Sequence, residues 1–157
     1  MLPWFEWMEN LPVSVALRES LWLGPIINAL HVVVLVVLIG AVLIVDLRLL
    51  GTGLKNLPVA RVAKDARPWL IAGILGMVMT GIPQLISTAT KEYYSDFFWW
   101  KMELLLAALV FTFTVRHMVT MADPARISPV WVKLTGVVSM LLWFGVAIEG
   151  RLIGLLS

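Results

Sequence analysis

Two histidines are the residues of this sequence best suited to metal chemistry. His31 and His117 are the only histidines in the chain, and each stands within a long apolar run. An ionisable residue in a membrane-spanning segment is a functional candidate by default, and imidazole is a common axial ligand of haem iron. We therefore interpret both as candidate metal ligands, with haem b as the expected cofactor. The structural alternative is a neutral imidazole that only hydrogen-bonds a neighbouring helix.

Helical spacing predicts that the two histidines lie at different depths. His31 follows Trp22 by nine residues, about 13 Å of helix. His117 follows Trp100 by seventeen residues, about 25 Å. With both tryptophans in one aromatic belt, the depths differ by about 12 Å, which disfavours a single haem held by both histidines. The spacing instead favours two sites, each completed by a methionine, by the same histidine of a dimer partner or by an open position.

Cations near the ends of the predicted helices are candidates to pair with haem propionates, since guanidinium and ammonium groups bind carboxylates well. On the outer side these are Arg18, Lys101 and Arg151, and on the inner side Arg48, Arg116 and Lys133. The alternative is that these side chains only reach toward the lipid headgroups. The outer cations make His31 the better-supplied candidate site.

Two other chemistries use the same helices. Thioether and imidazole together suit Cu(I), although methionine is commonly a core filler. The 3.6-residue period puts Glu103 and His117 on one helix face, so transport of copper or protons by these residues and His31 is a further hypothesis. The lack of cysteine excludes disulfides, thiolate metal sites and iron–sulfur clusters, and no hydrolase or nucleotide fingerprint is present. The sequence does not decide whether the protein is an enzyme.

Membrane-spanning helices are the elements predicted to position these residues. Of the 157 residues, 61% are hydrophobic and 14% charged, against about 45–50% and about 25% in soluble domains. The apolar residues fall in runs close to the roughly 20 residues that a spanning helix needs. The predicted spans cover about residues 21–46, 69–89, 98–121 and 129–150. We expect one integral membrane domain over residues 1–157, in contact with the lipid bilayer and with no nucleic-acid partner.

Two shorter helices complete the predicted fold. Tryptophans recur at helical spacing within residues 1–11, which is typical of a helix lying in the membrane interface. Residues 58–67 have an apolar and a charged face and precede Pro68, so they are predicted to form a short helix on the cytoplasmic surface. The predicted fold class is therefore an all-α polytopic membrane four-helix bundle, with an N-terminal interfacial helix and a short cytoplasmic surface helix.

The second span carries a stripe of small residues. From Gly73 to Ser87, small side chains recur three or four positions apart. Such a stripe lets another helix approach closely, so we expect it to face the bundle while Leu75 and Ile82 face lipid.

The distribution of basic residues predicts the orientation. Eight of the twelve lie in residues 46–68 and 116–133, on one side of the predicted membrane. The positive-inside rule places that side in the cytoplasm. We expect a bacterial inner membrane protein whose two termini are periplasmic.

Four stretches carry a resemblance to a known family. They are Arg18-Glu19-Ser20 with Trp22, Pro25 and His31; Gly40 with residues 46–51; Phe97-Phe98 with Lys101 and His117; and residues 150–153. In this order the chain resembles an uncharacterised family of small bacterial four-helix membrane proteins, catalogued as a domain of unknown function. The resemblance covers nearly the whole chain and implies the same topology, but no activity. In layout alone, the chain is similar to cytochrome b561-like and copper-resistance membrane proteins.

These observations leave three functional hypotheses open. The leading one is a membrane redox subunit that binds haem b and exchanges electrons with quinone or a periplasmic partner. The second is a non-catalytic accessory subunit that docks into a larger membrane complex or forms a homodimer. The third is a copper or proton transporter.

Overall fold

Four long helices form the body of the protein. The computed structural model describes residues 1–156, and each of the four is long and apolar enough to cross a membrane. They are α3 (Leu23–Leu49), α4 (Val59–Ser87), the third helix (Asp96–Met121) and α8 (Pro129–Leu156). The third helix consists of α6 (Asp96–Phe111), the π-helical turn η1 (Thr112–Arg116) and α7 (His117–Met121). This architecture confirms the predicted all-α membrane four-helix bundle.

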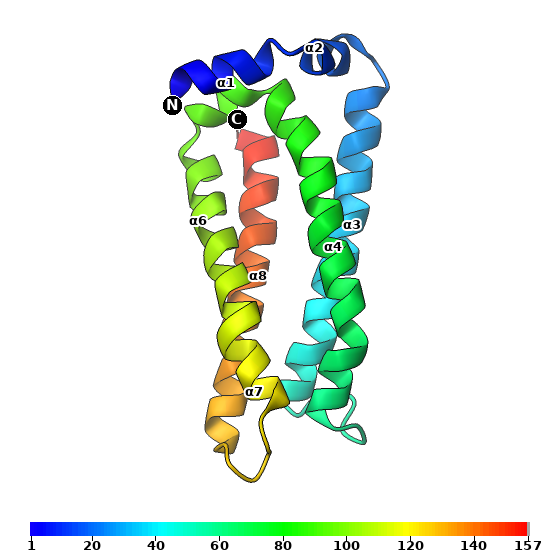
Figure 1. Cartoon of the computed structure of the whole chain (residues 1–157), viewed down its shortest axis with the longest axis vertical. Helices are drawn as coiled ribbons and strands as arrows, with labels where there is room; N and C mark the ends of the chain where they lie inside the picture. The colour runs from blue at the N-terminus through cyan, green and yellow to red at the C-terminus, as the bar shows by residue number, and fades with distance from the viewer. Residues whose placement is uncertain (157) are drawn as a thin grey trace.

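Two short helices lie across one end of the bundle. They are α1 (Leu2–Glu9) and α2 (Pro12–Glu19), and a further turn, α5 (Ala89–Tyr93), packs beneath α1 (Figure 1). The chain reaches this end again at the close of α8, so we call it the terminal end and the opposite one the loop end. The N-terminal helix predicted within residues 1–11 corresponds to α1, and α2 is a second helix that the sequence did not predict.

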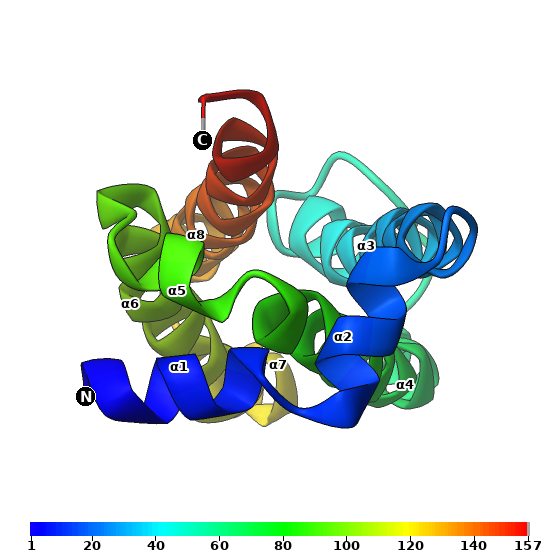
Figure 2. The same ribbon diagram turned by 90° about the horizontal axis from the view of Figure 1, so that it is seen from above.

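The four long helices associate as two pairs. Along its length α3 packs against α4, and α6 packs against α8, while contacts between α3 and α8 join the pairs (Figure 2). At the loop end α7 also contacts α4. The central core consists of Leu38, Ala41, Val42, Leu70, Ala108, Trp143 and Val146. This core separates the terminal half of the bundle from the loop half.

Close packing of α3 on α4 depends on the predicted small-residue stripe. A Cβ atom at Gly73 would lie 2.9 Å from the Leu38 Cβ, and one at Gly76 would lie 2.8 Å from a methyl carbon of Val34. Both distances are shorter than carbon atoms tolerate, so only glycine fits there without movement. The exposure of Leu75 and Ile82 agrees with their predicted orientation toward lipid.

The prediction of a separate surface helix over residues 58–67 was wrong. These residues form the first turns of α4, which continues through Pro68 and Pro83. Val62 and Ala66 are buried against Val45 and Leu49 of α3. Burial of this apolar face holds the turn before Pro68 in helical geometry, although proline disfavours that geometry in the residue preceding it.

Candidate functional site

His31 faces α4, where a polar contact fixes its ring. Its Nδ1 atom lies 2.7 Å from the Thr80 hydroxyl oxygen. The Thr80 hydroxyl donates its single proton to the carbonyl oxygen of Gly76, also at 2.7 Å. Nδ1 is therefore assigned as the donor toward Thr80, which leaves Nε2 unprotonated. Within residues 1–156, the Nε2 atom has no hydrogen-bond partner.

Two adjoining cavities border His31, one polar and one apolar. The polar cavity has a volume of about 210 Å³, and its polar lining residues are Asn28, His31, Gln84, Lys101 and Arg151. The apolar cavity, of about 310 Å³, lies between α4 and α6 and is lined mainly by aliphatic side chains. His31, Met77 and Lys101 line both cavities. The space around the imidazole is therefore amphipathic.

Gly81 keeps the imidazole accessible from α4. A Cβ atom at this position would lie 3.4 Å from the Cε1 atom of His31. Because Gly81 also lines the apolar cavity, any larger side chain there would extend toward the ring and reduce the open space.

The structure brings two of the three predicted outer cations to His31. Lys101 lines both cavities and Arg151 lines the polar one. Arg18 lies elsewhere, on the surface of the terminal end, where its Nη1 atom is 2.7 Å from the Glu9 carboxylate. Two cationic side chains are thus available at the polar end of the cavities, and the Arg18 side chain is not.

Acceptors for these cations are scarce in the bundle. Within the described chain, Lys101 has no hydrogen bond and no ion pair within 4.0 Å. Glu92 of α5 is near enough for electrostatic attraction, and burial raises the pKa of its carboxyl while Lys101 opposes that rise. The Nε2 atom of Gln84 is also buried without a partner among residues 1–156. The polar cavity therefore presents donors that a ligand rich in oxygen acceptors would satisfy.

His117 stands apart from this site. It is exposed on α7 and borders a crevice of about 30 Å³ at the loop end. This crevice shares no lining residue with the two His31 cavities. Glu103 and His117 are both exposed, and the π-helical turn Thr112–Arg116 lies between them on the third helix. His117 borders the crevice, whereas Glu103 lines neither the crevice nor the two His31 cavities.

The depth difference between the two histidines is larger than the sequence predicted. Lys101 lies at the level of His31, since both line the same cavities, and His117 follows Lys101 by sixteen residues. This spacing corresponds to about 24 Å of helix, in place of the predicted 12 Å. The prediction assumed that Trp22 and Trp100 mark one level, but Trp22 directly precedes α3 whereas Trp100 lies within the first turns of α6.

A buried ion pair that was not predicted from the sequence joins α3 to the third helix. The Nε atom of Arg116 lies 2.9 Å from a carboxylate oxygen of Asp46, and both side chains are buried. Arg116 also donates to the carbonyl oxygen of Val42 at 3.1 Å. The sequence predicted Arg116 as an inner cation available to haem propionates or lipid headgroups, but Asp46, at the predicted end of the first span, occupies it. The available signal was the spacing of these residues. Asp46 follows His31 by fifteen residues, just as Arg116 follows Lys101.

The protein itself offers few metal ligands. Among residues 1–156, no group of three or more His, Asp or Glu side chains is placed to hold a metal ion. Haem iron needs fewer ligands from the protein than a bare metal ion does, because the macrocycle supplies four ligands and the protein supplies only axial ones. The geometry of His31 is compatible with that role.

Comparison with known proteins adds a family. No curated protein and no solved structure matches the chain. The model of one family, described as a family of unknown function (DUF6644), matches residues 5–156. This match confirms the predicted membership of an uncharacterised family, and the chain belongs to DUF6644.

Proposed function

We propose that this protein is a membrane redox protein that binds haem b beside His31. The observation that carries the proposal is the fixed imidazole, with Nδ1 held by Thr80 and Nε2 free at the border of two cavities. Metal-ligating histidines usually donate their second ring N–H to a fixed acceptor, which orients the ring and raises its basicity. Thr80 supplies that acceptor and is itself held by the carbonyl oxygen of Gly76.

The two cavities provide the two environments that haem requires. Lys101 and Arg151 are available to pair with propionates at the polar end, and the buried Gln84 amide donor lies beside them. Aliphatic side chains between α4 and α6 offer an apolar wall for the macrocycle. When bound, haem would supply one-electron exchange. Met77, which lines both cavities, is the methionine best placed to complete the axial coordination.

Electron transfer fits the core better than ion transport does. Between the levels of His31 and Asp46, the described core includes Leu38, Ala108 and Trp143 and carries no titratable group. An ion or proton would have to cross this apolar layer without polar partners, at a cost of several kcal/mol. We propose lipid-soluble quinone or a partner at the terminal end as the electron donor or acceptor.

Absorption spectroscopy of the protein purified from haem-replete cells tests the proposal. We expect a Soret band that His31→Ala abolishes and His117→Ala, the matched control, leaves unchanged. Loss of the band in both variants, or no band in the wild-type protein, would contradict the proposal. Thermal melting of each variant distinguishes loss of the ligand from loss of the fold.

For the orientation, we propose a bacterial inner membrane with the terminal end periplasmic. The excess of basic residues toward the loop end supports this arrangement. Because the chain has no cysteine, single cysteines can report on each end. Glu19→Cys should react with an impermeant maleimide added outside spheroplasts, and Lys55→Cys should react only after lysis. The reverse pattern would overturn the orientation.

A further inference from the structure

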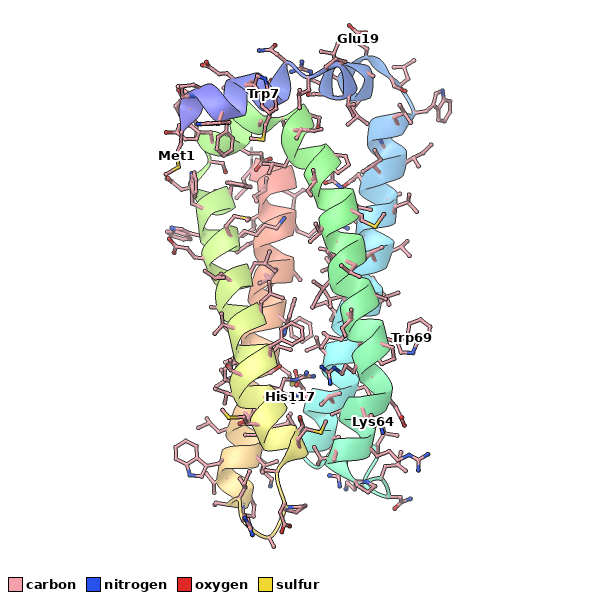
Figure 3. The ribbon with its side chains drawn as sticks, viewed as in Figure 1. Met1, Trp7, Glu19, Lys64, Trp69 and His117 are labelled. Carbon is pink, nitrogen blue, oxygen red and sulfur yellow. The ribbon has the colours of Figure 1, made fainter. Side chains whose placement is uncertain are left out.

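The loop end contains a cationic crevice between α4 and the third helix. Arg67 and His117 line it from opposite helices, and both side chains are exposed. Within residues 1–156, neither side chain has a hydrogen-bond or ion-pair partner. Figure 3 shows His117 on the third helix, between the levels of the outward-pointing Trp69 and of Lys64. Exposed tryptophans favour the headgroup region, so the crevice lies near headgroup depth.

The positive charge of this crevice is not balanced by the protein. Arg116 also lines it, but its guanidinium is paired with Asp46. The nearest acidic residue along α4, Asp65, lies 3.7 Å from Arg61 on an exposed face. Arg67 therefore carries an uncompensated charge, and the imidazole of His117 can donate at least one N–H beside it.

An apolar seam continues from the crevice toward the terminal end. On α4 the seam follows Leu70, Ile74 and Val78, and on the third helix it follows Phe113 of η1 and Leu109 and Leu105 of α6. Their spacing of three or four residues keeps them on facing sides of the two helices. A chain anchored at Arg67 and crossing half of the roughly 30 Å hydrocarbon core would extend about ten residues along α4. It would end near Val78, at the apolar cavity.

We propose that this crevice binds the phosphate of one anionic phospholipid, with an acyl chain lying along the seam between α4 and α6. Arg67 pairs with the phosphate as a two-pronged donor, and His117 donates to a further phosphate oxygen. A volume of about 30 Å³ admits phosphate oxygens but no larger group. The phosphate contacts are independent of the proposed haem site, because the crevice shares no lining residue with either cavity beside His31. Only the far end of the acyl chain would reach residues that line the apolar cavity.

Native mass spectrometry of the purified protein with added lipid tests this site. With phosphatidylglycerol we expect one retained lipid, and with phosphatidylcholine much weaker retention, since its net charge is zero. Arg67→Gln should weaken phosphatidylglycerol binding about five- to tenfold, and His117→Gln should weaken it less. The matched control is Arg126→Gln, which removes an exposed arginine at the same end but outside the crevice.

Three outcomes would overturn the proposal. Equal losses in Arg67→Gln and Arg126→Gln would indicate diffuse surface charge. Equal retention of both lipids would indicate a purely apolar groove. Displacement of the lipid by millimolar glycerol phosphate would indicate a site for free phosphate. Haem content, measured on the same samples, is expected to be unchanged in Arg67→Gln, so failure here is distinguishable from failure of the haem proposal.

Discussion

The two halves of the bundle treat their polar groups differently. In the loop half, the buried charges of Asp46 and Arg116 pair at 2.9 Å, and the Trp143 ring N–H donates to Thr112. Of the buried polar atoms in this pair, only the second carboxylate oxygen of Asp46 is left without a hydrogen-bond partner among residues 1–156. In the terminal half, the imidazole Nε2 of His31 and the ammonium of Lys101 face cavities without a partner in the described chain. Unsatisfied polar groups inside a membrane protein are costly. The loop half is therefore a structural clamp, and the unpartnered polar groups of the terminal half support the haem site proposed there.

The π-helical turn η1 belongs to the clamp. Its residues Thr112 and Arg116 are both buried, and their side chains meet Trp143 and Asp46. A π-helical turn changes the direction of the side chains that follow it, and such turns are frequent at functional sites. Here the turn lets two polar residues four positions apart reach partners on two different helices.

Removal of one partner of the clamp should have the largest effect. Asp46→Ala leaves the Arg116 guanidinium buried and uncompensated, which typically costs about 3–5 kcal/mol of unfolding free energy. For a chain of this size, we expect the thermal midpoint in detergent to fall by roughly 10 °C. Replacing both residues together, as in Asp46→Leu with Arg116→Met, should recover most of the loss because no charge remains buried.

The matched control for the clamp is the exposed pair of Arg61 and Asp65. Their side chains lie 3.7 Å apart and are about two-thirds exposed, so solvent screens the attraction. Asp65→Ala should leave the thermal midpoint unchanged. A change as large as that of Asp46→Ala would show that burial does not distinguish the two pairs.

Substitutions that disturb the packing between α3 and α4 should have the next largest effect on stability. Gly73→Ala would place its Cβ 2.9 Å from the Leu38 Cβ and 3.0 Å from its Cα, and backbone has to move to relieve the overlap. We expect a loss of about 1–3 kcal/mol, measured by thermal melting. Gly40→Ala, with no atom within 4 Å of its new Cβ, is the control and should be neutral. Equal melting temperatures for the two variants would contradict the close approach.

Substitutions in the terminal half should change the affinity for haem more than they change thermal stability. Thr80→Val keeps the shape of the side chain but removes the acceptor of the His31 N–H. Loss of such a supporting contact typically weakens metal affinity about tenfold or more. Haem titration followed at the Soret band measures this effect, and Thr80→Ser should restore the affinity. If Thr80→Val binds haem as tightly as the wild-type protein, the proposed role of Thr80 is wrong.

Sequence patterns predicted the fold better than the site. Long apolar runs identify spanning helices without reference to a partner, so the four spans could be predicted. The start of α4 could not be predicted, because Pro68 is a local signal for a helix break. Burial of Val62 overrides that signal, so the helix begins earlier. The candidate site residues His31, Lys101 and Arg151 were selected by residue type, but their grouping around one cavity depends on the vertical offset between helices. The prediction took Trp22 and Trp100 as markers of one membrane level, and this assumption gave the wrong offset.

For the same reason, the pairing of Asp46 with Arg116 was not predicted. Asp46 and Arg116 stand near the ends of apolar runs, where charged residues commonly meet water or headgroups. Their pairing becomes visible only once α3 and α6 are aligned through His31 and Lys101, each fifteen residues earlier. One known contact between two helices therefore predicts the next, whereas composition alone does not.

The smallest predicted effect concerns the attachment of α1 at the terminal end. A carboxylate oxygen of Glu9 accepts the backbone N–H of Thr90 at 2.9 Å, and the other accepts from Arg18 at 2.7 Å. The Thr90 contacts, with help from Arg18, lower the pKa of Glu9 below its ordinary value of 4.5. Since the unfolded chain takes up this proton first, the stabilisation is present above pH 4.5 and is lost as the pH falls through the lower folded pKa.

Protonation of Glu92 affects the stability in the opposite direction and over a different pH range. Burial raises the pKa of Glu92 above 4.5, so the folded protein takes up that proton first and gains stability as the pH falls toward 4.5. The thermal midpoint should therefore rise slightly on acidification to pH 4.5 and decline below it. Because the Glu9 pair lies at the surface, its share should stay under about 1 kcal/mol, or about 3 °C. Glu9→Gln should remove only the decline, and Glu6→Gln, an exposed control on the same helix, should retain it. An unchanged decline in Glu9→Gln would show that α1 is held by its apolar contacts alone.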